Sequence, residues 1–174
     1  MIHLLEIEID VLTESVIEIT TGKIFKTKVL QTDKNFLNTI HKKNGWKFNW
    51  KKEKKEINRL IYKLVLESNK SILLGLISLE TREDHVHIHL VEKAPIEFGI
   101  SKTYKGIGGN LFAFACKYSQ ENGFDGVVAF SAKTNLIHHY SVTLGATLIK
   151  NQKMFIHNTQ ANFLINKYFK DEEK

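Results

Sequence analysis

One glycine-rich stretch, T-Y-K-G-I-G-G-N at residues 103–110, constrains the fold of this chain more than any other feature. Three of the four residues from Gly106 to Gly109 are glycine, and an apolar run follows directly. Glycine tolerates positive φ and lets another group approach the backbone closely. A helix that begins here would direct unpaired N–H groups outward, which suits a phosphate. The stretch therefore predicts either an anion site or a turn that only permits tight helix–strand packing.

Two common nucleotide-binding patterns do not match this stretch. The dinucleotide pattern G-x-G-x-x-G is not completed, because residue 111 is leucine. The triphosphate pattern requires Gly-Lys followed by Ser or Thr, and the chain has no such triplet. A dinucleotide fold and a triphosphate fold are therefore not expected, although the physical argument for an anion at the helix start stands.

The elements around the stretch predict a mixed α/β sheet. Alternating apolar and polar residues mark half-buried strands, and the first of them, 6–11, opens a meander or hairpin with a turn at 20–22. The strands before and after the glycine-started helix form one β-helix-β unit and should be parallel. We expect strands at 6–11, 16–19, 23–30, 61–67, 71–80, 85–91, 126–131, 146–149 and 154–157, and helices at 34–41, 110–122, 134–145 and from 159 onward.

Composition limits the class of protein. The chain has 174 residues, of which 43% are hydrophobic, which suits one domain with a real core. A lone cysteine, no secretory leader and no apolar run of about 20 residues lead us to expect a cytoplasmic protein with no membrane contact. The net charge of +6 favours anionic partners, but ordinary surface solubility explains it equally simply.

Two ordered motifs carry a resemblance to a known family. Residues 104–111, Y-K-G-I-G-G-N-L, resemble the acetyl-CoA pyrophosphate loop of GNAT-type N-acetyltransferases, which reads Arg/Gln-x-x-Gly-x-Gly/Ala. Thr103 stands at the Arg/Gln position, so Lys102 or Lys105 would supply the charge. Residues 132–146 are similar to the family's second motif, in which an asparagine opens a helix that ends in tyrosine and then Leu-Gly. The resemblance covers roughly residues 62–157.

The resemblance implies a fold and a domain organisation. The fold would be α/β and GNAT-like, with a mixed, mostly antiparallel central sheet flanked by helices around a parallel β-helix-β unit. Residues 1–174 would form one domain, with the acetyl-CoA-binding core at 57–160 and a terminal helix at 159–174. The first part, residues 1–56, resembles nothing that we can name.

The resemblance also implies a cosubstrate, acetyl-CoA, and the residues that hold it. Backbone N–H groups at the helix start would bind the pyrophosphate, and the end of the preceding strand would pair with the pantetheine arm as an added strand does. Asn135 would orient that arm or simply cap its own helix. The implied cofactor-binding residues are Leu90, Val91, Thr103, Lys105, Gly106, Ile107, Gly108, Gly109 and Asn135.

Two roles in the chemistry, an acid and a base, have candidate residues. Acyl transfer to an amine requires removal of a proton from the amine and delivery of one to the departing thiolate. Tyr140 resembles the family's general acid, with His139 as a neighbouring substitute, although a core tyrosine bonded to backbone is the plain alternative. Glu92, or else Glu80, would be the base, although glutamates at strand ends are usually just solvated.

Three other sequence features could indicate a different function. His85, His87 and His89 share one strand face, but three collinear imidazoles make a poor tetrahedral site, so we expect no metal. Residues 42–55 contain seven lysines, two tryptophans and a phenylalanine, which could grip nucleic acid by charge and stacking. Aromatics packed on the sheet, with the lysines in water, are the preferred reading. Cys116 is expected to be a buried hydrophobe.

These observations predict an N-acyltransferase that moves an acetyl group from acetyl-CoA to an amine by direct transfer. A non-catalytic GNAT-fold binding module is the main alternative, and a nucleic-acid-binding protein is a third that we do not favour. The acceptor and the oligomeric state cannot be read from the sequence.

Overall fold

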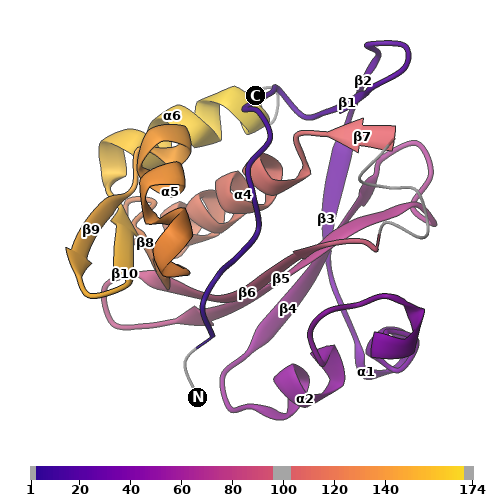
Figure 1. Ribbon diagram of the computed structural model, residues 1–174, viewed down its shortest axis with the longest axis horizontal. Helices are drawn as coiled ribbons and strands as arrows, with labels where there is room; N and C mark the ends of the chain where they lie inside the picture. Colours follow the sequence, from indigo (N-terminus) through magenta and orange to yellow (C-terminus); the bar gives the residue numbers. More distant parts are fainter. Residues whose placement is uncertain (1–2, 96–102, 171–174) are drawn as a thin grey trace.

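The computed structural model describes residues 3–95 and 103–170 and is built on a seven-stranded sheet (Figure 1). Neighbouring strands are antiparallel except β6 and β8, which pair in parallel through Val86 with Val128 and His87 with Ala129. The predicted mixed, mostly antiparallel sheet with a parallel β-helix-β unit is therefore confirmed. Its order is β3 (Thr27–Gln31), β4 (Leu60–Leu66), β5 (Leu73–Thr81), β6 (Val86–Lys93), β8 (Val128–Ser131), β10 (Lys153–Ile156) and β9 (Thr147–Lys150).

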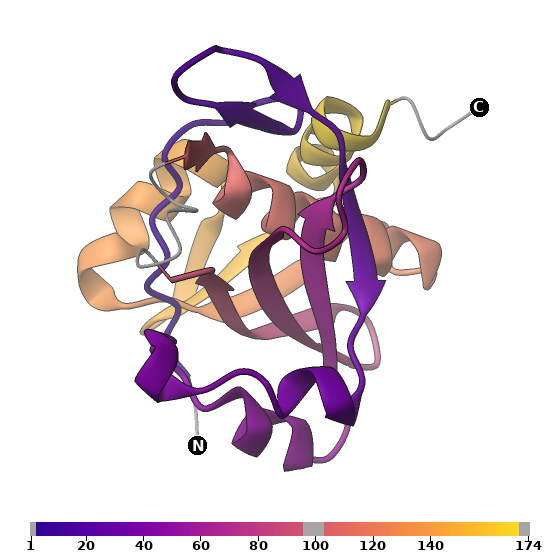
Figure 2. The same cartoon turned by 90° about the vertical axis from the view of Figure 1, so that its right-hand side faces the viewer.

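Helices cover both faces of the sheet (Figure 2). On one face α4 packs against α6, and the aromatic rings of Phe112, Phe130 and Tyr140 join α4, β8 and α5 in the main core. On the other face, a smaller apolar cluster forms around Trp46 and Trp50. The helices are α1 (Lys34–Leu37), α2 (Trp50–Lys55), α4 (Ile107–Glu121), α5 (Ile137–Leu144) and α6 (Asn158–Phe169), with 3-10 turns η1 (Lys42–Asn44) and η3 (Thr134–Leu136).

A second, three-stranded sheet joins the N-terminal hairpin to the residues that precede α4. Strand β1 (Val16–Glu18) pairs with β2 (Ile24–Phe25) on one side and with β7 (Tyr104–Lys105) on the other. The predicted turn at 20–22 is confirmed, with Gly22 at φ 74°. This small sheet holds the start of α4 against the N-terminal part of the chain.

Several helix boundaries differ from the prediction: the helix expected at 134–145 is the 3-10 turn η3 followed by α5, and two further differences have a clear local cause. Helix α4 begins at Ile107, three residues earlier than expected, because Gly106 takes the left-handed conformation (φ 94°) and serves as the N-cap. Gly108 and Gly109 therefore belong to the first helical turn rather than to a loop. Helix α1 starts at the predicted Asp33 cap but stops at Leu37, where the Thr39 hydroxyl donates to the Phe36 carbonyl and competes with further helix.

The predicted strand at 6–11 is wrong as a strand, although its alternation is real. Residues 3–13, the N-terminal segment, run extended across the molecule in front of α4 (Figure 1). Leu5, Ile7 and Ile9 are buried, whereas Glu8 and Asp10 are exposed. The segment is joined to the main sheet at Leu5, whose N–H donates to Ser131 O at 2.7 Å and whose carbonyl accepts from Lys133 N at 3.0 Å. Its apolar side faces the main core rather than a hairpin partner.

Candidate functional site

The start of α4 lies against the chain's own N-terminal segment. The Gly106 N–H donates to both carboxylate oxygens of Asp10, at 3.2 and 3.3 Å. A Cβ added at Gly106 would lie 2.6 Å from Ser15 O, and one at Gly108 would lie 2.9 Å from Ile9 Cδ1. These distances are shorter than real Cβ contacts allow. Glycine is needed at Gly106, where backbone of the same chain packs closely and φ is 94°, whereas at Gly108 only the end of the Ile9 side chain would have to shift.

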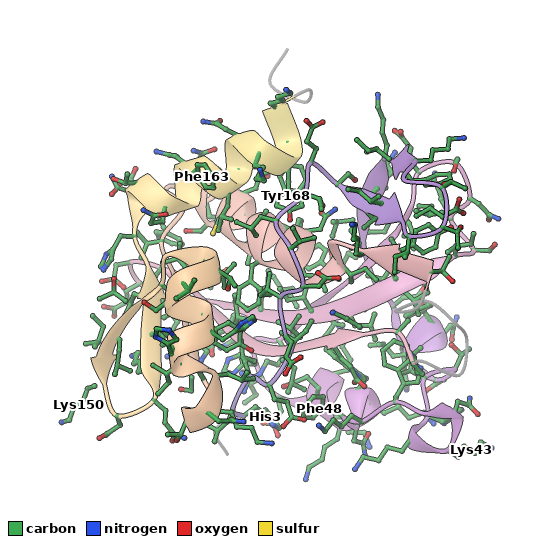
Figure 3. The ribbon with its side chains drawn as sticks, turned by 45° about the horizontal axis from the view of Figure 1, so that its top comes forward. His3, Lys43, Phe48, Lys150, Phe163 and Tyr168 are labelled. Carbon is green, nitrogen blue, oxygen red and sulfur yellow. The ribbon has the colours of Figure 1, made fainter. Side chains whose placement is uncertain are left out.

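Further hydrogen bonds fix the N-terminal segment along its length. The Tyr140 hydroxyl donates to Ile7 O at 2.6 Å, and the Ile9 N–H donates to His139 Nε2 at 2.8 Å. Near its end, the Thr13 N–H donates to the Tyr168 hydroxyl at 3.0 Å; Tyr168 lies on α6, beside the segment (Figure 3). The segment thus contacts both helices that follow the glycine stretch.

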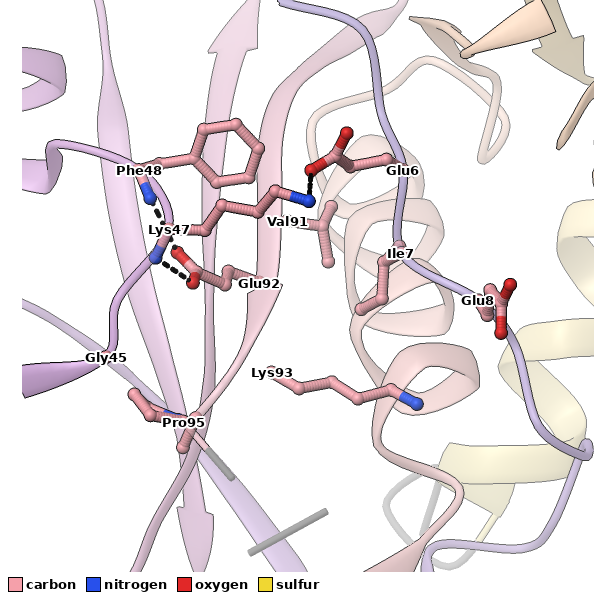
Figure 4. A pocket seen from close by; sticks show the side chains of 11 residues that line it. Glu6, Ile7, Glu8, Gly45, Lys47, Phe48, Val91, Glu92, Lys93 and Pro95 are labelled. Carbon is pink, nitrogen blue, oxygen red and sulfur yellow. Dashed lines mark hydrogen bonds and ion pairs between the residues drawn. The ribbon is translucent and has the colours of Figure 1, made fainter. Parts of the chain in front are cut away.

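A cavity of about 590 Å³ opens between the end of β6 and residues 6–8 (Figure 4). It forms because β6 and β8 pair only through Val86 and His87 and then diverge, so that the N-terminal segment runs on the β8 side of the gap. Lys93 extends from β6 toward the segment. The lining residues are Glu6, Ile7, Glu8, Gly45, Lys47, Phe48, Val91, Glu92, Lys93, Ala94 and Pro95.

Glu92, the predicted base, anchors the loop before α2. Its carboxylate accepts from Lys47 N at 2.6 Å, from Phe48 N at 3.3 Å and from Trp50 Nε1 at 2.8 Å. Burial raises the pKa of Glu92, and these three donors oppose that shift. A carboxylate held by three donors is well placed to position residues 45–50 on β6, whereas accepting a proton from an amine would require it to loosen those bonds.

A β-bulge explains why Glu92 faces that loop. Ser78 pairs with Leu90 and Leu79 pairs with Ile88, so His89 is an extra residue on β6. The bulge shifts the alternation by one position. Leu90 and Glu92 then face the α2 side, whereas Val91 faces the main core and lines the cavity.

Glu6 joins the two walls of the cavity. Its carboxylate pairs with the ammonium group of Lys47, and with Lys133 at 2.8 Å. Burial alone would raise the pKa of Glu6, but the hydrogen bonds from Lys133 and Lys47 outweigh it and hold the pKa below its usual value. The two lysines come from the loop before α2 and from the end of β8, so Glu6 ties both to the N-terminal segment.

Tyr140, the predicted acid, is fully buried. Its ring packs on Phe112 and Phe130, and its hydroxyl donates a hydrogen bond to Ile7 O. Burial raises the pKa of Tyr140, and the nearby Glu6 and Glu8 raise it further. In this arrangement the hydroxyl stabilises the N-terminal segment, and a reacting group would reach it only after Ile7 had moved.

The other residues expected to bind the cofactor lie in different surroundings. Val91 and Ile107 are buried near the cavity and the helix start, whereas Leu90 packs toward α2. Thr103 O accepts from Ile19 N at 2.8 Å, and Lys105 pairs with Ile17, so both belong to the small-sheet side. Asn135 is exposed, and neither η3 nor α5 has a side-chain cap. Lys102, an alternative source of charge, lies outside the described residues.

The histidine row forms a buried polar network. His89 Nε2 lies 2.7 Å from Glu80 Oε1, and Arg59 and Arg82 also contact that oxygen. Burial lowers the pKa of His87 to about 3, helped by His89, and lowers that of His89 to about 4 despite the Glu80 hydrogen bond. Both are therefore neutral near pH 7. Within the described ranges, no group of three or more His, Cys, Asp or Glu is arranged to hold a metal ion.

The lysine–tryptophan stretch does not present its tryptophans for stacking. Trp46 and Trp50 are 4% and 0% exposed, and Trp50 Nε1 donates to Glu92. The lysines remain mostly at the surface. The packed-aromatic reading is therefore the one that the structure supports. Cys116 is fully buried, and burial raises its thiol pKa, as expected of an inert core residue.

Comparisons with known proteins identify the fold. No family model and no curated protein matches the sequence. Among solved structures, a mutant form of the spermidine/spermine N-acetyltransferase SpeG from Vibrio cholerae is 14% identical, with a TM-score of 0.52, covering 79% of this chain and 98% of that one. A chimera of the spermidine N-acetyltransferase SpeG from Vibrio cholerae and hSSAT is 13% identical, with a TM-score of 0.54, covering 79% of this chain and 99% of that one. A dodecameric structure of the spermidine N-acetyltransferase from Vibrio cholerae is 14% identical, with a TM-score of 0.51, covering 78% of this chain and 95% of that one.

The fold is therefore GNAT-like, as the two sequence motifs indicated. At this level of identity the likeness concerns the fold and leaves the substrates open. None of the helices in residues 3–95 and 103–170 is long and apolar enough to span a membrane.

Acetyl-CoA, the cosubstrate implied by the resemblance, does not fit the helix start in this arrangement. The Gly106 N–H that would meet a phosphate already binds Asp10, and Ile9 lies against Gly108. A pyrophosphate there would also meet the Asp10 carboxylate at close range. The cavity beside β6, by contrast, has room for an extended ligand.

The sequence analysis missed the residues that close the helix start, Asp10 above all. The alternation of residues 6–11 indicated one acidic and one apolar side. That pattern has no information about which distant element the acidic side meets, so only the tertiary arrangement places Asp10 on Gly106.

Proposed function

We propose that this chain is a GNAT-fold N-acyltransferase that moves an acetyl group from acetyl-CoA to an amine, with its donor site closed by its own residues in the arrangement described. The observation that carries the proposal is the cavity of about 590 Å³ where β6 leaves β8, next to a glycine-started helix. In this fold the resemblance assigns that position to the cosubstrate.

The wall of β6 supports this assignment. Beyond His87, the strand pairs with β5 on one side, and its other side faces the cavity. An extended ligand such as a pantetheine arm can hydrogen-bond to a strand edge of this kind. Val91 supplies an apolar surface there, and Lys93 a cation.

The acceptor is proposed only as an amine. The similar structures are described as spermidine N-acetyltransferases, which makes spermidine a sensible first compound to test. Three carboxylates, those of Glu6, Glu8 and Glu92, line the cavity and would attract an ammonium group. Glu6 and Glu92 already have partners, so Glu8 is the carboxylate of the three that we propose to meet the acceptor.

A non-catalytic GNAT-fold module is the second candidate, and one observation favours it. The Tyr140 hydroxyl and the Gly106 N–H are both used within the chain. Tyr140 and Glu92 would then be structural residues, and the N-terminal segment would cover the start of α4 permanently.

Calorimetric titration with acetyl-CoA, CoA and ATP separates the two candidates. Binding of both CoA compounds but not ATP, followed by acetyl transfer to spermidine or another amine, would support the enzyme. Absence of a response to either CoA compound at millimolar concentration, in wild type and in a chain with Asp10 replaced by alanine, would leave the non-catalytic module as the better account.

A further inference from the structure

A second cavity, which we call the apolar cavity, lies on the α2 side of the sheet. Its volume is about 450 Å³, within the range of about 300–1,000 Å³ that is typical of small-molecule sites. It lies between α1 and the ends of β5 and β6. Its apolar walls are made by Phe36, Ile40, Trp46, Ile72, Leu73 and Ala94.

The chemistry of these walls favours an uncharged, apolar group. Ile40, Trp46 and Ala94 are buried members of the smaller apolar cluster. None of the described residues that line the cavity is charged, although 25% of the chain's residues are. Apolar walls that face empty space lack dispersion contacts, and an apolar ligand restores them. The apolar cavity is therefore suited to an aromatic or alkyl group.

The apolar cavity adjoins the cavity beside β6. The loop before α2 lies between them, with alternate residues on each side. Asn44 and Trp46 line the apolar cavity, whereas Gly45 and Lys47 line the cavity beside β6, across from residues 6–8 (Figure 4). Ala94 lines both. The two cavities therefore meet where β6 ends.

The cavity beside β6 has the opposite chemistry. Its lining includes three carboxylates, those of Glu6, Glu8 and Glu92, and two lysines, Lys47 and Lys93, which leaves a net negative balance. Such a balance attracts a cation. An apolar cavity that meets an acidic one selects a ligand in which an ammonium group is joined to an apolar group.

We propose that the apolar cavity is a specificity subsite that holds the aryl or alkyl group of a primary amine, while its ammonium group lies in the cavity beside β6. This inference deepens the proposed function, on which it rests for the claim that the bound amine is acetylated. Spermidine, which carries several amines, is then a poor acceptor, because an ammonium group in the apolar cavity would meet no charged partner.

The test uses three probes: 4-phenylbutylamine, butylamine, which has no ring, and 4-phenylbutanol, which has no charge. The full chain is titrated with each above pH 7, and the tryptophan indole N–H signals are followed by NMR. Trp46 lines the apolar cavity and reports on the ring. Trp50 donates to Glu92 and reports on the cavity beside β6. Nuclear Overhauser effects from the phenyl protons to the methyl groups of Ile40 and Ile72 locate the ring.

We expect 4-phenylbutylamine to bind about ten- to hundredfold more tightly than butylamine, the gain expected from burial of one aromatic ring. The alcohol should bind more weakly than the amine, because the carboxylates do not attract it. Equal affinities of the two amines, or absence of Overhauser effects to both isoleucines, would overturn the subsite. An alcohol that binds as tightly as 4-phenylbutylamine would overturn the assignment of an amine.

Two matched variants test the position of the subsite. Ser71→Phe places a ring at the rim of the apolar cavity, and Ser68→Phe makes the same change in the same β4–β5 connection, outside the lining. Both serines are exposed, so both variants should fold, which thermal unfolding verifies. Ser71→Phe should weaken 4-phenylbutylamine by about fivefold or more and leave butylamine unchanged, because it takes up space for the ligand's ring. Equal effects of the two variants would contradict the proposal.

Activity measurements keep this inference apart from the proposed function. If 4-phenylbutylamine binds with the expected Overhauser effects but no chain acetylates it in the presence of acetyl-CoA, the amine site stands and the proposed function fails. If the chain acetylates butylamine and 4-phenylbutylamine with equal KM, and Ser71→Phe changes neither, the proposed function stands and the subsite fails.

Discussion

The end of β6 and the start of α4 both lie beside the N-terminal segment, yet the first borders an open cavity and the second is covered. At β6, the diverging parallel strands leave about 590 Å³. At α4, Asp10 and Ile9 lie directly on Gly106 and Gly108. The difference teaches that glycines at a helix start permit the close approach of any group, and that this group can belong to the chain itself. The predictions below test how firmly the covering segment is held.

The largest effect is expected from the buried half of the N-terminal segment. Leu5→Ala removes a side chain that is 1% exposed and leaves a cavity in the main core. We expect a loss of about 2–5 kcal/mol in the free energy of unfolding, measured by denaturant titration. The matched change Val11→Ala, in the exposed part of the segment, should cost less than about 0.5 kcal/mol. Similar losses for the two variants would remove the distinction between the buried and the exposed part of the N-terminal segment.

A pH dependence of stability is expected from the histidine row. The pKa values of His87 and His89 are lowered to about 3 and about 4, below the usual 6.5. Between the lowered pKa of the folded chain and the usual pKa of about 6.5, the unfolded chain binds more protons than the folded one. Stability therefore falls as pH drops from about 6.5 toward 4. We expect a loss of a few kcal/mol, measured by unfolding at several pH values, and a smaller slope in His87→Gln. An unchanged slope in that variant would contradict the buried, neutral His87.

Measurements of ligand binding should accordingly be made above pH 7. Both histidines are neutral there in folded and unfolded chains, so the row contributes no slope of its own. Any change in binding then reports on the binding site.

An intermediate effect is expected from the tyrosine that holds the segment. Tyr140→Phe leaves the buried Ile7 carbonyl without its donor, which should cost about 1–3 kcal/mol in thermal or chemical unfolding. If Tyr140 also acts as the acid, turnover with acetyl-CoA should fall while CoA affinity is kept. A Tyr140→Phe chain of wild-type stability would show that the bond to Ile7 contributes nothing.

The smallest effect is expected from the ion pair at the edge of the cavity. Lys133 has a half-exposed side chain and shares Glu6 with Lys47. Lys133→Met should therefore change the free energy of unfolding by less than about 1 kcal/mol. Salt titration of wild type and variant provides the check, because screening should reduce the difference; a loss above 2 kcal/mol would mean that Glu6 is a major anchor of the segment.

The sequence predicted those parts of the fold that local sequence patterns determine. The parallel pair β6–β8, the turn at 20–22 and the helix after the glycines follow from local periodicity and glycine chemistry. The β-bulge at His89 could not be predicted, because it arises from register between strands. It decides that Glu92 turns toward the loop before α2.

The candidate site was less predictable than the fold. Glycines at 106, 108 and 109 indicate that something comes close, and the identity of that neighbour depends on a contact between residues 96 positions apart. Tyr140 was identified from the resemblance of residues 132–146 to the second GNAT motif, but its burial and its bond to Ile7 are tertiary properties. Sequence reasoning therefore found the closely approached helix start and missed the residues that cover it.

The most direct measurement of the central claim is the contact between Ile9 and Gly108 in solution. In the full chain without ligand, a nuclear Overhauser effect should join the Ile9 δ-methyl group to the Gly108 α-protons, because that side chain lies against the start of α4. A second should join Leu12 to Gly109, because those two residues also lie close together. Absence of both signals in the ligand-free chain would contradict a helix start that is covered by the chain's own N-terminal segment.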